Sequence, residues 1–181
     1  MKEFYEFLRK EYAEKKICWE DPEFSPEISQ LYKDPNNMPE KFKHLTFEFV
    51  RPEEMNPDEH DNLKFYYFNN SSNINYQYNI KRGILNDKFF ISAVLMLFKK
   101  KEEFFSNLVL DIENVDKNLQ AGFVGFTFFI NGSWKNVTVD TRIPWHQTND
   151  VTLSTVEAGK PSYWLTLFQK AYSKIHKTYD V

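Results

Sequence analysis

Two runs of alternating apolar and polar residues meet at Asn131-Gly132, and this arrangement limits the possible folds more than any other part of the sequence. The runs lie within residues 122–144 and are rich in aromatic and β-branched side chains, which favour strands. Asparagine followed by glycine is a preferred pair for a two-residue hairpin turn, because both turn residues adopt a positive φ. The sequence therefore predicts a β-hairpin and, around it, a small antiparallel sheet.

Residues 87–100 are apolar at nearly every position and end in two lysines. Asp87 stands where an N-cap is expected, and the lysines suit the negative end of a helix dipole. A helix that is apolar on all sides is typical of the centre of a core, so we expect this one to be a buried central helix. It is too short to cross a bilayer, which needs about 20 apolar residues.

A second helix is predicted from Tyr163 to Lys177, because Trp164, Leu167 and Phe168 recur at helical spacing. Helices that flank a small antiparallel sheet give an α+β fold. Since a chain of 181 residues fits one domain with an appendage, we expect a single main domain.

The appendage is residues 1–18, which we interpret as an N-terminal amphipathic helix, and the main domain is residues 19–181. Phe4, Phe7 and Leu8 share one face of this predicted helix. Because an apolar face needs a surface to pack on, we expect the helix to dock on a partner.

Composition excludes several classes of partner and site. The formal net charge is -3, from 23 basic and 26 acidic residues, so no basic surface for nucleic acid or anionic membranes is expected. The N-terminus has charges throughout and no apolar run, which is unlike a signal peptide or a spanning helix. Cys18 is the single cysteine, so it forms no internal disulfide and no cysteine-cluster metal site, and a cytoplasmic location is the default.

Several patches of the sequence, taken in order, resemble the first lobe of the calpain protease core. They are Asp21-Pro22-Glu23-Phe24, Phe49-Val50-Arg51-Pro52, residues 82–90, residues 125–144 and residues 163–180. Their order and spacing carry the resemblance, which covers residues 19–181. It implies a papain-like, α+β lobe in which a buried central helix and flanking helices accompany a small antiparallel sheet.

The resemblance also implies the chemistry of a cysteine protease. In that chemistry a thiolate at a helix N-terminus works with a histidine and an asparagine from a second lobe, and a glutamine assists the oxyanion. Lys88 stands at the cysteine position and Arg82 at the glutamine position, so we expect two degenerate catalytic positions and no catalytic residue. One alternative stays open, because a lysine with a depressed pKa can act as a nucleophile and an arginine can stabilise an anion.

The remaining candidates do not complete a catalytic triad. The second lobe should follow Val181, where the sequence ends, so we expect it to be absent from this chain. The histidines lie outside any segment that resembles that lobe; they are His44, His60, His146 and His176. We expect Cys18 to be a small buried hydrophobic residue rather than a displaced nucleophile.

Active calpains bind calcium in this lobe, and Asn79 and Asp180 fall near the positions of two acidic ligands. An asparagine in place of a carboxylate removes charge from a site for a hard cation. We therefore expect no metal and no cofactor.

The sequence as a whole predicts a catalytically inactive calpain-like module that serves as a structural or protein-interaction subunit of a larger assembly. The alternative is one lobe of a calcium-dependent, cysteine-protease-like protein that another chain completes. We expect protein partners, no nucleic acid and no membrane insertion. The bias toward Asn, Lys and Phe resembles that of proteins from AT-rich protist genomes, which favours a cytoskeletal or ciliary assembly.

Overall fold

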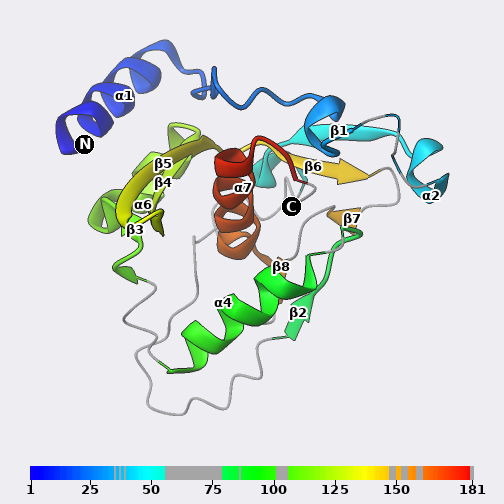
Figure 1. Ribbon diagram of the computed structural model, residues 1–181. Coiled ribbons are helices and arrows are strands. Elements are labelled where there is room, and N and C mark those ends of the chain that lie inside the picture. Colours follow the sequence, from blue (N-terminus) through cyan, green and yellow to red (C-terminus); the bar gives the residue numbers. More distant parts are fainter. Residues whose placement is uncertain are drawn as a thin grey trace.

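The computed structural model describes residues 1–34, 36, 38, 40–55, 79–85, 87–100, 106–146, 150–151, 155–157 and 161–179. Figure 1 shows helices around small antiparallel sheets, and the predicted α+β class is confirmed. The first sheet has the order β3-β4-β5, with β3 at Val109–Leu110, β4 at Phe123–Ile130 and β5 at Ser133–Asp140.

The hairpin of β4 and β5 forms where the sequence predicts it. The two strands pair antiparallel from Phe123 opposite Asp140 to Ile130 opposite Ser133. Asn131 and Gly132 both have positive φ, 51° and 77°, as the tight turn requires. The turn chemistry alone sets this register, so the prediction depends on nothing distant in the sequence.

Helix α7, Trp164–His176, packs on one face of the hairpin and forms the main core with it. The Phe168 ring stacks on that of Phe128, with centroids 4.9 Å apart, and meets that of Phe126 edge to face, with centroids 5.2 Å apart. Ring pairs of this kind add to the burial of their apolar area. The predicted helix from Tyr163 to Lys177 is therefore present, and its apolar face lies where the pattern put it.

Helix α4, Lys88–Lys100, confirms the predicted helix but corrects its predicted burial. Phe90, Ile91 and Val94 are buried, and the Phe90 ring contacts Phe168 and Tyr172 of α7, with centroids 5.8 and 5.0 Å apart. Phe89, Met96 and Leu97 are 52%, 64% and 49% exposed. An apolar composition sets how much surface a helix can bury, whereas its neighbours decide how much it does bury, and here α7 covers one side.

The other strands form two further sheets with the orders β1-β6-β7 and β2-β8-β9. Their bounds are β1 Phe47–Val50, β2 Asn79–Lys81, β6 Ile143–His146, β7 Asp150–Val151, β8 Thr155–Glu157 and β9 Pro161–Ser162. The short helices are η1 Ile28–Gln30, α2 Glu40–Lys43, α3 Pro52–Met55, η4 Ile112–Asn114 and α6 Val115–Gln120.

Helix α1, Lys2–Lys15, packs on the lobe itself. Tyr5 and Leu8 are 0% and 3% exposed and form a cluster with Trp19 and Phe123. The buried face differs from the predicted one, because Tyr5 is inside while Phe4 and Phe7 are 44% and 60% exposed. The same chain supplies the surface on which Tyr5 and Leu8 pack. Docking of the helix on a partner stays a prediction.

Polar contacts of Tyr5 and Arg9 also hold α1 on the lobe. The Tyr5 hydroxyl and Thr138 Oγ1 of β5 lie 2.8 Å apart, and Arg9 pairs with Asp111 and donates to Asn118 Oδ1 at 2.6 Å. Asn118 is 0% exposed, and Arg9 gives the oxygen of its buried side-chain amide a hydrogen-bond partner. These contacts fix both the position and the rotation of α1.

Candidate functional site

The N-terminus of α4 is the site that the sequence singles out. Lys88 is the first residue of the helix and is exposed, and Arg82 is exposed just after β2. The carbonyl of Asp87 accepts the first helical hydrogen bond from Ile91, 3.1 Å away, so Asp87 stands at the predicted N-cap position. Its buried carboxylate accepts a hydrogen bond from Gln169 of α7. The catalytic or degenerate role of Lys88 and Arg82 stays a prediction.

Cys18 lies in the segment between α1 and the lobe, where its thiol is half-buried. Burial raises the pKa of the thiol above its ordinary 9.0, and the opposing effect of the Arg51 charge is smaller. The sulfur is 3.9 Å from the carbonyl oxygen of Gln120. A nucleophilic cysteine needs a lowered pKa, so this environment does not activate Cys18.

The histidines lie on separate elements. His146 is buried in β6 with its ring 5.9 Å from that of Phe47, His44 is exposed after α2, and His176 ends α7 with its ring 4.6 Å from that of Tyr172. His60 lies outside the described residues. In the described ranges, no group of three or more His, Cys, Asp and Glu residues could hold a metal ion. Of the two calcium candidates, Asn79 begins β2 and Asp180 lies outside the described residues.

A buried charge cluster joins α7 to the end of β5. Lys170 is 1% exposed, and its ammonium lies 2.7 Å from a carboxylate oxygen of Asp140. Asp140 also accepts hydrogen bonds from the Arg142 side chain and from the backbone amides of Asp21 and Arg142, each at 2.9 Å. Burial opposes the charged carboxylate, but Lys170 and these donors outweigh it and lower the pKa of Asp140 from 3.8 to about 2.

A second ion pair lies one turn further along α7. The Lys174 ammonium is 2.9 and 3.0 Å from the two carboxylate oxygens of Asp21 and donates to the carbonyl oxygen of Thr138 at 2.9 Å. Glu23 adds a second carboxylate 3.1 Å away. Asp21 also accepts from the backbone amides of Glu23 and Phe24, so its carboxylate orders the segment that follows Trp19.

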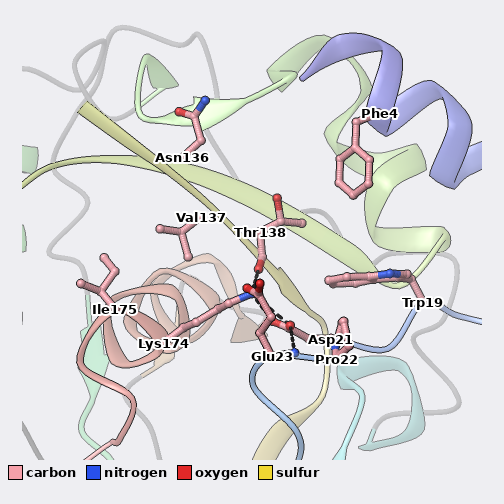
Figure 2. A pocket seen from close by; sticks show the side chains of 10 residues that line it. All are labelled: Phe4, Trp19, Asp21, Pro22, Glu23, Asn136, Val137, Thr138, Lys174 and Ile175. Atoms are coloured by element: carbon pink, nitrogen blue, oxygen red, sulfur yellow. Dashed lines mark hydrogen bonds and ion pairs between the residues drawn. The ribbon is translucent and has the colours of Figure 1, made fainter. Parts of the chain in front are cut away.

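This second ion pair lies in a pocket of about 440 Å³, a size that suits a side chain or a small ligand. Figure 2 shows β5 crossing between α1 and α7, with the segment after Trp19 on the far side from Ile175. The lining residues are Phe4, Trp19, Asp21, Pro22, Glu23, Asn136, Val137, Thr138, Lys174 and Ile175. Two carboxylates and one ammonium give the pocket an excess negative charge.

Comparison with known proteins identifies the family to which this chain belongs. A sequence model described as calpain family cysteine protease matches residues 19–181. The chain belongs to the calpain family. It is 28% identical over 176 residues to a calpain of Schistosoma mansoni and 30% identical over 178 residues to the calpain-2 catalytic subunit of Mus musculus. Each of these two alignments covers 97% of the chain.

The calpain-family relatives are much longer than this chain. The match spans 21% of the Schistosoma mansoni protein and 23% of the Mus musculus protein. A calpain-type cysteine protease of Zea mays is 29% identical over 160 residues, 88% of the chain and 7% of the relative. In the described ranges, no helix is long and apolar enough to cross a membrane.

Sequence reasoning missed the charge cluster and the pocket of this calpain-family lobe. Lys170 and Lys174 are one turn apart in a helix whose other face is apolar, and two lysines at that spacing are usually a solvated face. Their partners Asp140 and Asp21 lie 30 and 153 residues away in the sequence. The available signal was the position of Lys170 between Phe168 and Ala171, inside the buried stripe.

Proposed function

We propose that this calpain-family lobe is a non-catalytic protein-interaction module. The observation that carries the proposal is Lys88, which begins α4 at the place where the resemblance puts the nucleophilic cysteine. An ammonium there faces the positive end of the helix dipole and offers no thiolate. Arg82, at the glutamine position, supports the same conclusion, since it places a second cation in this part of the sequence.

The state of the single thiol also supports the proposal. Cys18 is the one cysteine of the sequence, and its pKa is raised by burial. It lies after α1 and contacts the carbonyl of Gln120. A thiol in that state does not replace a nucleophile missing from residue 88.

Cleavage of casein tests the absence of catalysis. The purified chain and Lys88→Ala are incubated with casein, with calcium and with a chelator, beside an active calpain. We expect no cleavage above buffer in any sample with this chain. Calcium-dependent cleavage that Lys88→Ala abolishes would show that Lys88 is a nucleophile and would refute the proposal, whereas cleavage that appears only with a partner chain would favour a lobe completed in trans.

The exposed face of α4 supports a role in binding a protein. Phe89, Met96 and Leu97 recur at helical spacing and are each about half exposed or more. Contiguous apolar side chains at a surface are typical of interaction sites. We include in the proposal an obligate protein partner in a cytoskeletal or ciliary assembly, which the Asn, Lys and Phe bias of the sequence favours.

Affinity capture with matched variants tests this partner. Met96→Glu and Leu97→Glu together place charges on the α4 face, and Ile28→Glu places one on a different exposed apolar residue, 50% exposed, as the control. We expect the α4 variant to lose the cytoskeletal or ciliary proteins that the wild type and the control retain. Equal recovery of these partner proteins with the wild type, the α4 variant and the control would exclude the α4 face as the binding site.

A further inference from the structure

Strand β5 is at the edge of its sheet, and its first half is open to solvent. The sheet has the order β3-β4-β5, so β5 has a paired neighbour on one side in the described part of the chain. Residues 133–136 are all exposed, with Trp134 at 59%, and no described strand pairs with them on the side away from β4. An open edge strand presents unpaired N–H and C=O groups that can pair with another strand.

The hydrogen bonds show which backbone groups of β5 point outward. The amide of Thr127 donates to the carbonyl of Leu108, on the β3 side of β4, and Thr127 pairs with Asn136. In an antiparallel ladder, opposite residues that do not bond each other point their N–H and C=O groups away from each other. The backbone groups of Asn136, and two residues earlier those of Trp134, therefore point to the open edge.

Lys174 marks the place where this open edge ends. The carbonyl of Thr138 also points outward, and it already accepts a hydrogen bond from the Lys174 ammonium at 2.9 Å. The pocket of about 440 Å³ begins at the same point, since Asn136, Val137 and Thr138 line it together with Ile175 of α7. A strand added to β5 would pair with Trp134 and Asn136 and would then reach the pocket.

The charges of the pocket indicate which side chain enters it. Lys174 is neutralised by Asp21 at 2.9 Å, and the Glu23 carboxylate, 3.1 Å from Lys174, is 78% exposed and gives the excess negative charge. The rings of Phe4 and Trp19 border the same space, as Figure 2 shows, and aromatic faces attract cations. A long basic side chain, with an aliphatic stem and a cationic end, matches these surroundings.

We propose that the open edge of β5 binds an extended segment of a separate protein, which adds a strand beside Trp134 and Asn136 and places a lysine or arginine in the pocket next to Glu23. Main-chain hydrogen bonds supply the affinity of such strand addition, and the pocket supplies the selectivity. This inference rests on the proposed function, because it names the surface and the chemistry of a partner for the same interaction module.

Two synthetic ten-residue peptides test the proposal by titration into the nitrogen-15-labelled chain. Both alternate threonine and valine; one carries an arginine near one end, and the other carries a glutamate there. We expect the amide signals of Trp134 and Asn136 to shift with the arginine peptide, and its affinity to exceed that of the glutamate peptide by about tenfold or more. No shift at these amides with either peptide would overturn the proposal.

Two pairs of variants separate the edge from the pocket. Asn136→Pro removes an outward amide donor at a position where an edge strand tolerates proline, and Asn136→Thr keeps the donor. We expect the proline variant to lose binding and the threonine variant to keep it. Glu23→Gln should reduce the preference for arginine, whereas Glu48→Gln, at an exposed carboxylate of β1, should not. Equal peptide binding within each pair of variants would contradict the proposal that the peptide pairs with Asn136 and places its arginine next to Glu23.

Two controls distinguish this inference from other outcomes. Sedimentation of the chain alone shows whether β5 pairs with a second copy, and a dimer that Asn136→Pro dissociates would assign the edge to self-association and overturn the proposed partner. Casein cleavage is measured on the same samples. Failure of the peptide titration with no cleavage refutes the strand-addition site alone, whereas cleavage abolished by Lys88→Ala refutes the proposed function alone.

Discussion

Asp140 shows how one carboxylate can hold several segments together. It is 0% exposed and binds the Lys170 ammonium, the Arg142 side chain and the backbone amide of Asp21. Taking these charges out of water is unfavourable, and only the complete set of partners offsets that cost. The stability of the cluster therefore depends on every member being present.

Asp140→Asn should destabilise the lobe by about 3–5 kcal/mol, because it leaves the ammonium of Lys170 buried without a charged partner. Urea unfolding followed by circular dichroism measures the change. Glu20→Gln is the matched control, since Glu20 pairs with Arg142 at 3.2 Å but is 68% exposed, and its loss should change stability by less than about 1 kcal/mol. A loss below about 1 kcal/mol for Asp140→Asn would show that Lys170 is not held as a buried cation.

Cys18 gives a second prediction at the scale of one residue. Because burial raises its pKa, its thiolate should form at higher pH than that of an ordinary cysteine, and alkylation by iodoacetamide at pH 8 should be slow. The rate is measured against pH in the folded chain and in urea, where the thiol is exposed. A folded chain that reacts faster than the unfolded chain at pH 8 would show an activated thiol.

Among the elements, α1 depends on the absence of a side chain at Gly125. A Cβ at that position would meet the Tyr5 hydroxyl, would lie 2.8 Å from Cζ of the same ring and would lie 3.1 Å from Cδ1 of Leu110. The ring of Tyr5 is itself 0% exposed and cannot move outward without leaving its cluster with Phe123. The glycine thus makes room for the residue that anchors α1.

Gly125→Ala should displace α1 and lower stability by about 1–3 kcal/mol, as overpacking does in a filled core. Limited proteolysis should then cut near residues 15–18 faster than in the wild type. Tyr5→Phe, which removes the hydroxyl that the Cβ would meet, should cost about 1 kcal/mol alone and should relieve part of the cost of Gly125→Ala in the double variant. Strictly additive losses would show that the two residues do not interact.

The elements also show what the sequence can and cannot predict. The β4–β5 hairpin and α7 were predictable because a turn pair and a helical spacing are local signals. The burial of α4 was overestimated, since residues 87–100 carry no information on which neighbours cover them. The face of α1 was assigned partly to Phe4 and Phe7, whereas Gly125 selects Tyr5. The pocket depends on contacts such as Lys174 to Asp21, which are distant in sequence and leave no local pattern.

At the scale of the whole molecule, ionisable groups far apart in the sequence limit the pH range in which the lobe is stable. Asp140 has a pKa lowered to about 2 in the folded state, so its contribution is complete above its ordinary 3.8 and is lost as the pH falls toward 2. Tyr5 behaves in the opposite sense. Burial raises its pKa from 10.0 to about 12, against the smaller effect of the hydrogen bond to Thr138.

The loss of folding stability at alkaline pH should therefore come from buried tyrosines. Below pH 10 the neutral phenol of Tyr5 fits its apolar site, but between pH 10 and 12 the unfolded chain loses the proton first, so stability falls by about 2–3 kcal/mol. Urea midpoints measured from pH 8 to 11.5 give the slope of stability against pH.

The urea midpoint of Tyr5→Phe should be lower than that of the wild type at pH 8 and should fall less steeply as the pH rises. The remaining slope is due to Tyr179, whose pKa burial also raises. If Tyr5→Phe kept the wild-type slope, the loss of stability at alkaline pH would not involve the contact between α1 and β5, and the helix would contribute to stability through its apolar face and the pairing of Arg9 with Asp111.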